Sequence, residues 1–143
     1  MSVKEKFVTN PLSAVLRIDQ ITTEKAELEL ALGSQVERFQ LRRDGSSFFA
    51  QLNIPIARSA WDDVSNFVQK FGARILALQT DRRIGSAVID MAFPIDDRMA
   101  TASIGLASHV AAIIGKFGID LEFSIYSTSN DGEGSSSDGD DVD

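Results

Sequence analysis

The chain has 143 residues, of which 43% are hydrophobic, and its 14 basic and 21 acidic residues give a formal net charge of −7. This length predicts one domain with a sizeable core, and the lack of cysteine excludes disulfides, thiolate metal sites and cysteine nucleophiles. No apolar run reaches the length of a signal-peptide core or of a membrane span, which predicts a cytoplasmic protein without a membrane partner.

The first predicted strand spans residues 14–18, where apolar and polar side chains alternate. Residues 25–32 fit two structures. As a strand they would align Leu28, Leu30 and Leu32 on one face, whereas a helix would turn Leu30 away from the other two. As a helix they would have a threonine pair before them as N-terminal caps, followed by good helix formers. We favour the strand, because it explains all three leucines.

A hairpin is predicted next. Residues 36–43 lead into Asp44 and Gly45, a dipeptide suited to a tight turn because glycine tolerates positive φ. On the far side, alternating apolar residues predict a long strand over 48–56. Pro55 lies near its end, where a missing N–H donor does least harm.

Residues 59–71 form the clearest predicted helix, with Ser59 as its cap and a regular apolar stripe. We expect Gly72 to end this helix in the left-handed conformation. A strand is then predicted over 74–80, and alternation resumes in a further strand over 87–93.

A second helix is predicted from near Ser103 to Lys116, with Gly118 as its stop, before a last strand over 121–126. Both halves therefore carry Pro-Ile before a helix and Lys-Phe-Gly at its end. We interpret the shared residues as structural: a glycine stop, an aromatic ring for packing, and a cation (Lys70 or Lys116) near the negative helix end.

Together these elements predict an α+β fold in which residues 47–127 form a ferredoxin-like βαββαβ core. Its antiparallel sheet would carry two helices on one face and be extended by N-terminal β-strands. We expect residues 1–127 to form a single domain.

Residues 128–143, the acidic segment, contain six acids and no base, which leaves 15 acids against 14 bases in the rest of the chain. We expect this segment to be disordered, because it has almost no apolar residue to bury. It either keeps the protein soluble or competes electrostatically for a basic surface.

Few residues could carry chemistry. His109, the single histidine, is interpreted as a structural residue of the second helix. Two acidic pairs, at 62–63 and 96–97, stand near the predicted helix starts, where the helix dipole explains them; a carboxylate-only cation site at Asp62, Asp63, Asp96 and Asp97 is the alternative. Asp90 interrupts an apolar strand and is expected to face solvent. We assign no catalytic, metal-binding or cofactor-binding residue, and expect no cofactor.

Nucleic-acid binding is disfavoured. Arginine pairs at 42–43 and 82–83 stand beside predicted turns, but the body of the chain is close to neutral. Phe39 and Phe49 are the only candidates for stacking aromatics on a sheet, and no glycine-rich phosphate loop is present. The expected partner is therefore another protein, or a second copy in a homodimer through the sheet.

The last strand, Gly118-Ile119-Asp120-Leu121-Glu122-Phe123-Ser124-Ile125-Tyr126, resembles a Gly-Ile-Asp-Leu-x-Phe-x-Ile-Tyr pattern. That pattern is similar to one in an uncharacterised bacterial family of small domains, some of them like immunity proteins. The family has no established activity, so the resemblance implies a bacterial source and no catalytic residue.

The resulting hypothesis is a non-enzymatic protein-binding module, of immunity or adaptor type, that acts by covering a partner's surface. The alternative is a regulatory βαββαβ domain that senses a small ligand as a dimer. An enzyme using a carboxylate-bound cation is the third hypothesis.

Overall fold

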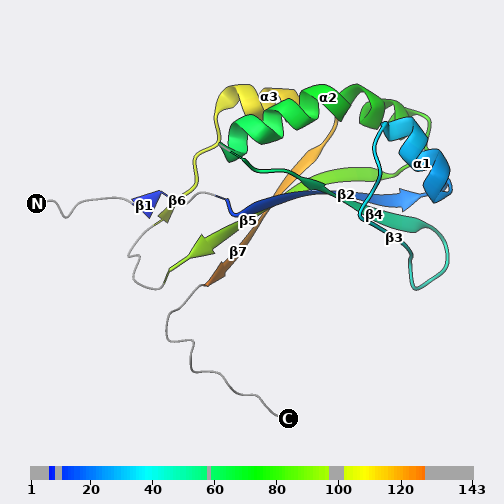
Figure 1. The fold of residues 1–143 in the computed structure, drawn as a ribbon, viewed down its shortest axis with the longest axis horizontal. Coiled ribbons are helices and arrows are strands. Elements are labelled where there is room, and N and C mark those ends of the chain that lie inside the picture. Colours follow the sequence, from blue (N-terminus) through cyan, green and yellow to red (C-terminus); the bar gives the residue numbers. More distant parts are fainter. Residues whose placement is uncertain (1–6, 9–10, 58, 97–101, 128–143) are drawn as a thin grey trace, which may run out of the picture.

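The computed structural model describes residues 7–8, 11–57, 59–96 and 102–127. The acidic segment and Asp97 lie outside these ranges, so the disorder expected of the acidic segment stays a prediction. The elements follow in the order β1 (Phe7–Val8), β2 (Ser13–Ile21), α1 (Lys25–Leu32), β3 (Arg38–Leu41), β4 (Phe48–Ile54), α2 (Ala60–Thr80), β5 (Ser86–Ile95), β6 (Ala102–Ser103), α3 (Ser108–Lys116) and β7 (Asp120–Ser127) (Figure 1).

Five strands form one mixed sheet in the order β3-β4-β2-β5-β7. Neighbours pair antiparallel, except that β7 runs parallel to β5. A parallel pair needs a long crossover, and α3 lies in that connection. Strands β1 and β6 pair with each other in a separate two-stranded ladder. All three helices cover the same face of the five-stranded sheet (Figure 1).

The core lies between that face and the helices. Alternate residues of the two central strands are buried there, including Leu16 and Ile18 of β2 and Ile89, Met91 and Phe93 of β5. Burying this apolar surface is the main favourable term in folding. The residues between them point to the other side, where no described helix covers the sheet (Figure 1). We call this side the open face.

Residues 25–32 are helical, so the strand prediction was wrong. In α1 the side chains of Leu28 and Leu32, four residues apart, are both fully buried, whereas Leu30 is 85% exposed. The helix therefore buries two leucines and leaves the third in water, as a period of 3.6 requires. Gly33 ends it at φ 79° and donates its N–H to the carbonyl of Glu29.

Helix α2 corresponds to the helix predicted over residues 59–71; it begins where predicted but does not stop at Gly72. Ser59 caps α2 by accepting from the N–H of Asp62, and the helix continues to Thr80. Ile75 and Leu78 prolong its buried stripe, so residues 74–80 are not a strand. Gly72 is instead a packing position, because a Cβ there would lie 2.4 Å from Cδ2 of Phe117.

Other predictions had mixed outcomes. The hairpin is confirmed, with Gly45 at φ 73°, and so is the stop at Gly118, with φ 69°. However, α3 begins at Ser108 rather than near Ser103, and β4 ends before Pro55. Both Lys-Phe-Gly copies place the lysine over the phenylalanine ring, but only the second lies at a helix end.

The α+β class is confirmed, whereas the ferredoxin-like core is not. Because the strand over 74–80 does not form, residues 47–127 provide β4, β5 and β7 to the five-stranded sheet instead of four antiparallel strands. The N-terminal strand β2 lies at the centre of this sheet, not at its periphery. A core confined to residues 47–127 would therefore lack the sheet's middle strand.

Candidate functional site

An ion network occupies the centre of the open face. The guanidinium of Arg17 on β2 donates to the carboxylate of Asp90 on β5 at 3.0 Å and also pairs with Glu122 on β7. The hydroxyl of Ser124 donates to the other oxygen of Asp90 at 2.8 Å. Asp90 lies on the open face, as expected, but Arg17 and Ser124 cover it, and its side chain is only 21% exposed. It is thus a paired structural anion.

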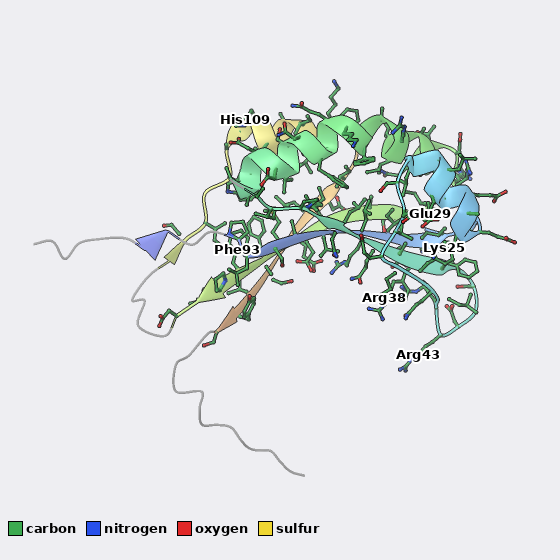
Figure 2. All side chains as sticks on the ribbon, in the orientation of Figure 1. Lys25, Glu29, Arg38, Arg43, Phe93 and His109 are labelled. Carbon is green, nitrogen blue, oxygen red and sulfur yellow. The ribbon has the colours of Figure 1, made fainter. Side chains whose placement is uncertain are left out.

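A second group lies beside the β3–β4 hairpin. It consists of Arg38, Gln40, Arg42, Arg43 and Phe49, which we call the arginine surface. The guanidinium carbon of Arg38 lies 5.2 Å from the centroid of the Phe49 ring, and that of Arg42 lies 5.9 Å from it. Both distances fall within the range of a cation–π contact. Arg38 and Arg43 extend from the side of the sheet away from the helices (Figure 2).

The local sequence explains this gathering. Residues 38, 40 and 42 follow each other at period two, so they project to one side of a strand. The hairpin then folds β4 back and pairs Gln40 with Phe49. The arginines therefore flank an aromatic ring that the hairpin turn brings between them.

The arginine surface lines a hollow, and part of its positive charge is neutralised by a neighbouring acid. It borders a cavity of about 560 Å³, to which Leu41 and Asp44 also contribute. A smaller hollow of about 190 Å³ shares Arg42 and Phe49 and reaches Arg17. Arg42 pairs with Asp19 at 2.9 Å, whereas Arg43 makes no hydrogen bond or ion pair with another described residue. Guanidinium groups favour carboxylate and phosphate ligands, because they can donate two parallel N–H bonds.

Asp44, in the hairpin turn, has a clearly lowered pKa. Its carboxylate accepts from the backbone N–H of Ser46 at 3.0 Å and from the hydroxyl of Ser46 at 2.7 Å. These bonds stabilise the charged form and hold the pKa of Asp44 below its ordinary value of 3.8. The turn is therefore best held when Asp44 is ionised.

A third feature is the outer strand β7, which forms one edge of the sheet. Three of its large apolar residues are exposed: Phe123 by 37%, Ile125 by 55% and Tyr126 by 43%. Phe123 packs edge-on against Phe93, with centroids 5.0 Å apart, and against Trp61 at 6.3 Å. These contacts pack one side of β7 against the core, while its outer edge has no described strand beside it.

A further hollow lies on the helix side, between β4 and α2. Its volume is about 420 Å³, and Phe67, Phe71, Lys70, Asn53 and Asn66 contribute to its wall. This volume lies within the usual range for small-ligand sites.

The residues singled out from the sequence do not come together. His109 is exposed on α3, in the helix layer (Figure 2). Asp62 and Asp63 lie in the first turn of α2, as expected, but Asp96 directly follows β5, twelve residues before α3 begins. Within the described ranges, no three His, Cys, Asp or Glu side chains gather in a way that could hold a metal ion.

The candidate aromatics separate as well. Phe39 stacks on Phe48 at 4.8 Å on the helix side, so only Phe49 lies with the arginines. Arg82 is exposed and Arg83 half-buried in the turn after α2. The sequence reasoning missed Arg38 and Gln40, although their alternation with Arg42 was a signal that could have identified them.

Comparisons with protein-family models, with curated proteins and with solved structures returned no significant match. Among the described residues, no helix is both long and apolar enough to cross a membrane.

Proposed function

We propose that the protein is a non-enzymatic protein-binding module that receives an extended segment of a partner protein at the edge of β7. The observation that carries this proposal is an eight-residue edge strand with three exposed large apolar side chains. An edge strand presents unpaired backbone N–H and C=O groups, which a partner strand can satisfy.

The two edges of the sheet differ in a way that supports this choice. Proteins commonly block edge strands with short lengths and charged side chains. β3 follows that pattern, since it has only four residues and carries Arg38. β7 is twice as long, and its middle residues, from Phe123 to Tyr126, carry no charge. The β7 edge is therefore the one suited to pairing.

The register defines the kind of segment that would fit. Phe123 and Ile125 pair with the buried Met91 and Phe93 of β5, so they point toward the helix layer. Backbone hydrogen bonds would give affinity, and alternate side chains would give specificity. We expect a partner segment with apolar residues at every second position, facing these two side chains.

The test compares two full-length variants that add one lysine to opposite edges of the sheet. Ile125→Lys puts a charge on the proposed edge, and Leu41→Lys, at a similarly exposed leucine, puts one on β3. We expect immobilised wild-type protein and Leu41→Lys to retain the same partner from native-host extract, and Ile125→Lys to lose it. Equal retention by both variants would refute the proposal.

A dimeric small-ligand sensor is the second candidate, and it uses the same edge. If two β7 strands paired antiparallel about Ser124, Phe123 would face Ile125 of the other copy and Glu122 would face its Tyr126. No like charges would stand opposite each other, which removes a common penalty. The hollow between β4 and α2 would then hold the ligand. A monomer by light scattering, with no thermal shift across a metabolite panel, would exclude this candidate.

A further inference from the structure

We propose that the arginine surface is an intramolecular binding site for the carboxylates of the chain's own acidic segment. This inference concerns the opposite end of the sheet from β7 and does not depend on the proposed function. It rests on the geometry of the arginines, on charge complementarity, and on the length of chain that follows β7.

The arginines are arranged to receive anions. A guanidinium that lies against an aromatic ring keeps its in-plane N–H donors at its edge, where they can bind a carboxylate with two parallel bonds. The guanidinium carbons of Arg38 and Arg42 both lie within cation–π distance of the Phe49 ring. Arg38 is also held by a 3.0 Å hydrogen bond that it donates to Oε1 of Gln40. Arg43 adds a third cation on the same rim of the hollow. The surface therefore offers oriented donors before any ligand arrives.

The acidic segment is the complementary partner within the chain. Six of the 21 acids lie in it, and it has no base, whereas residues 1–127 are nearly neutral. The nearest acids on the sheet do not saturate the arginine surface: Asp19 pairs with Arg42 alone, and Asp44 is held by Ser46. The largest group of acids without a base among them in the sequence is therefore the acidic segment.

The segment is long enough to reach the site. It leaves β7 at Ser127, four strand positions from β3, which is about 19 Å at 4.8 Å per strand. The pairing registers place Phe49 near the start of β5, some nine residues from the level of Ser127, or about 30 Å along the strands. The diagonal is about 36 Å, and sixteen extended residues span about 53 Å.

This distance also decides which acids can make contact. Asp131 and Glu133 lie within six residues of Ser127, so they reach only about 20 Å. The four later acids lie eleven or more residues from Ser127 and can reach the arginines; they are Asp138, Asp140, Asp141 and Asp143. The proposal therefore predicts an asymmetry within the acidic segment that nonspecific attraction would not produce.

The interaction should be weak and dependent on salt. All the groups are exposed, and charges in water are screened over about 10 Å at 0.1 M salt. Tethering compensates in part, because it gives the segment a high effective concentration at the site. The acidic segment would therefore compete with external acidic or phosphorylated ligands for the arginines at low ionic strength.

The test uses the full chain, which has no cysteine, with a nitroxide label at Ser137→Cys. At low salt we expect paramagnetic broadening of amide signals over residues 38–49, and at least a fivefold reduction of that effect in 0.5 M NaCl. Arg38→Gln, Arg42→Gln and Arg43→Gln together should abolish it. A control that removes two charges elsewhere, Arg82→Gln with Arg83→Gln, should not.

A second pair of variants leaves the folded body unchanged. Asp138→Asn, Asp140→Asn, Asp141→Asn and Asp143→Asn together should remove the broadening. Asp131→Asn with Glu133→Gln should preserve it. Equal effects of the two variants, or an equal loss in the Arg82 and Arg83 control, would overturn the proposal. The proposal would also be overturned if broadening appeared only on mixing nitroxide-labelled protein with ¹⁵N protein that carries no nitroxide, because such broadening means binding between copies. Ile125→Lys should leave the broadening unchanged, which separates this proposal from the β7 edge.

Discussion

Gly72→Ala tests the contact between α2 and the end of α3. Alanine is the best helix former, so this substitution in a helix interior ordinarily stabilises by about 0.8–1.0 kcal/mol. Here the new Cβ would lie 2.4 Å and 2.6 Å from Cδ2 and Cγ of the Phe117 ring, about 1 Å closer than ordinary contact. The ring or the helices must move to accept it.

The structure gives the expected size of the effect. Inserting a methyl group into a packed site costs about 1–3 kcal/mol. Set against the gain in helix propensity, Gly72→Ala should lower the free energy of unfolding by about 1 kcal/mol. In a Phe117→Ala background the clash is absent, so the same substitution should raise it by about 0.8–1.0 kcal/mol. The coupling between the two positions is then about 1–3 kcal/mol.

The assay is urea unfolding followed by circular dichroism on the four proteins of this cycle. Gly115→Ala is the matched control, because it lies in α3 and a Cβ there meets nothing within 4 Å. We expect it to stabilise by about 0.5–1 kcal/mol. If Gly72→Ala stabilised both backgrounds equally, the packing role of Gly72 would be refuted.

Three further predictions follow from local geometry. In urea unfolding, Leu28→Ala should cost about 2–5 kcal/mol of stability and Leu30→Ala less than about 0.5 kcal/mol, because only Leu28 is buried. Similar losses for the two variants would contradict the helical structure of α1. Gly118→Ala should cost about 1 kcal/mol by the same assay, because φ is 69°, and an unchanged midpoint would argue against a left-handed stop. Ser46→Ala should raise the pKa of Asp44 only partway toward 3.8 in an NMR titration, because the hydrogen bond from the backbone N–H of Ser46 remains. Since the folded-state pKa is lowered, ionised Asp44 stabilises the turn above about pH 4, and this stabilisation is lost as the pH falls. An unchanged pKa would disprove the role of the hydroxyl.

Local patterns were sufficient for several elements of the fold. The alternation in β2, β4 and β5 predicted strands with one buried face, and the structure confirms those strands. Asp44 and Gly45 predicted the hairpin, and Gly118 predicted the end of α3. In each case the decisive information lies within a few residues: a period of two, or a glycine at positive φ.

The errors arose where one local signal fits two structures. The leucines of residues 25–32 fit a strand face, and only the packing of Leu28 and Leu32 against the rest of the core selects the helix. Gly72 has the same sequence context as Gly118, yet it stays within a helix because the apolar stripe continues to Leu78. A glycine can end a helix, or it can leave room for a side chain from another segment to pack closely against the helix. At Gly72 that side chain is Phe117, which is 45 positions away in the sequence.

The candidate surfaces show the same division. The sequence showed the Arg42–Arg43 pair and the acidic segment, but the arginine surface depends on the hairpin register that pairs Gln40 with Phe49. The exposed edge of β7 depends on its parallel pairing with β5, and nothing local to residues 120–127 specifies that neighbour.

The sequence by itself determined the α+β class, most strands, the hairpin and the concentration of acid at the C-terminal end, because periodicity, turn chemistry and composition are local properties. Tertiary structure alone decided that β2 is central, that α2 continues through Gly72, and that β7 is an edge strand with no described strand beyond it. The physical reason is that burial depends on contacts between segments far apart in the chain, and free energy from those contacts overrides local preference.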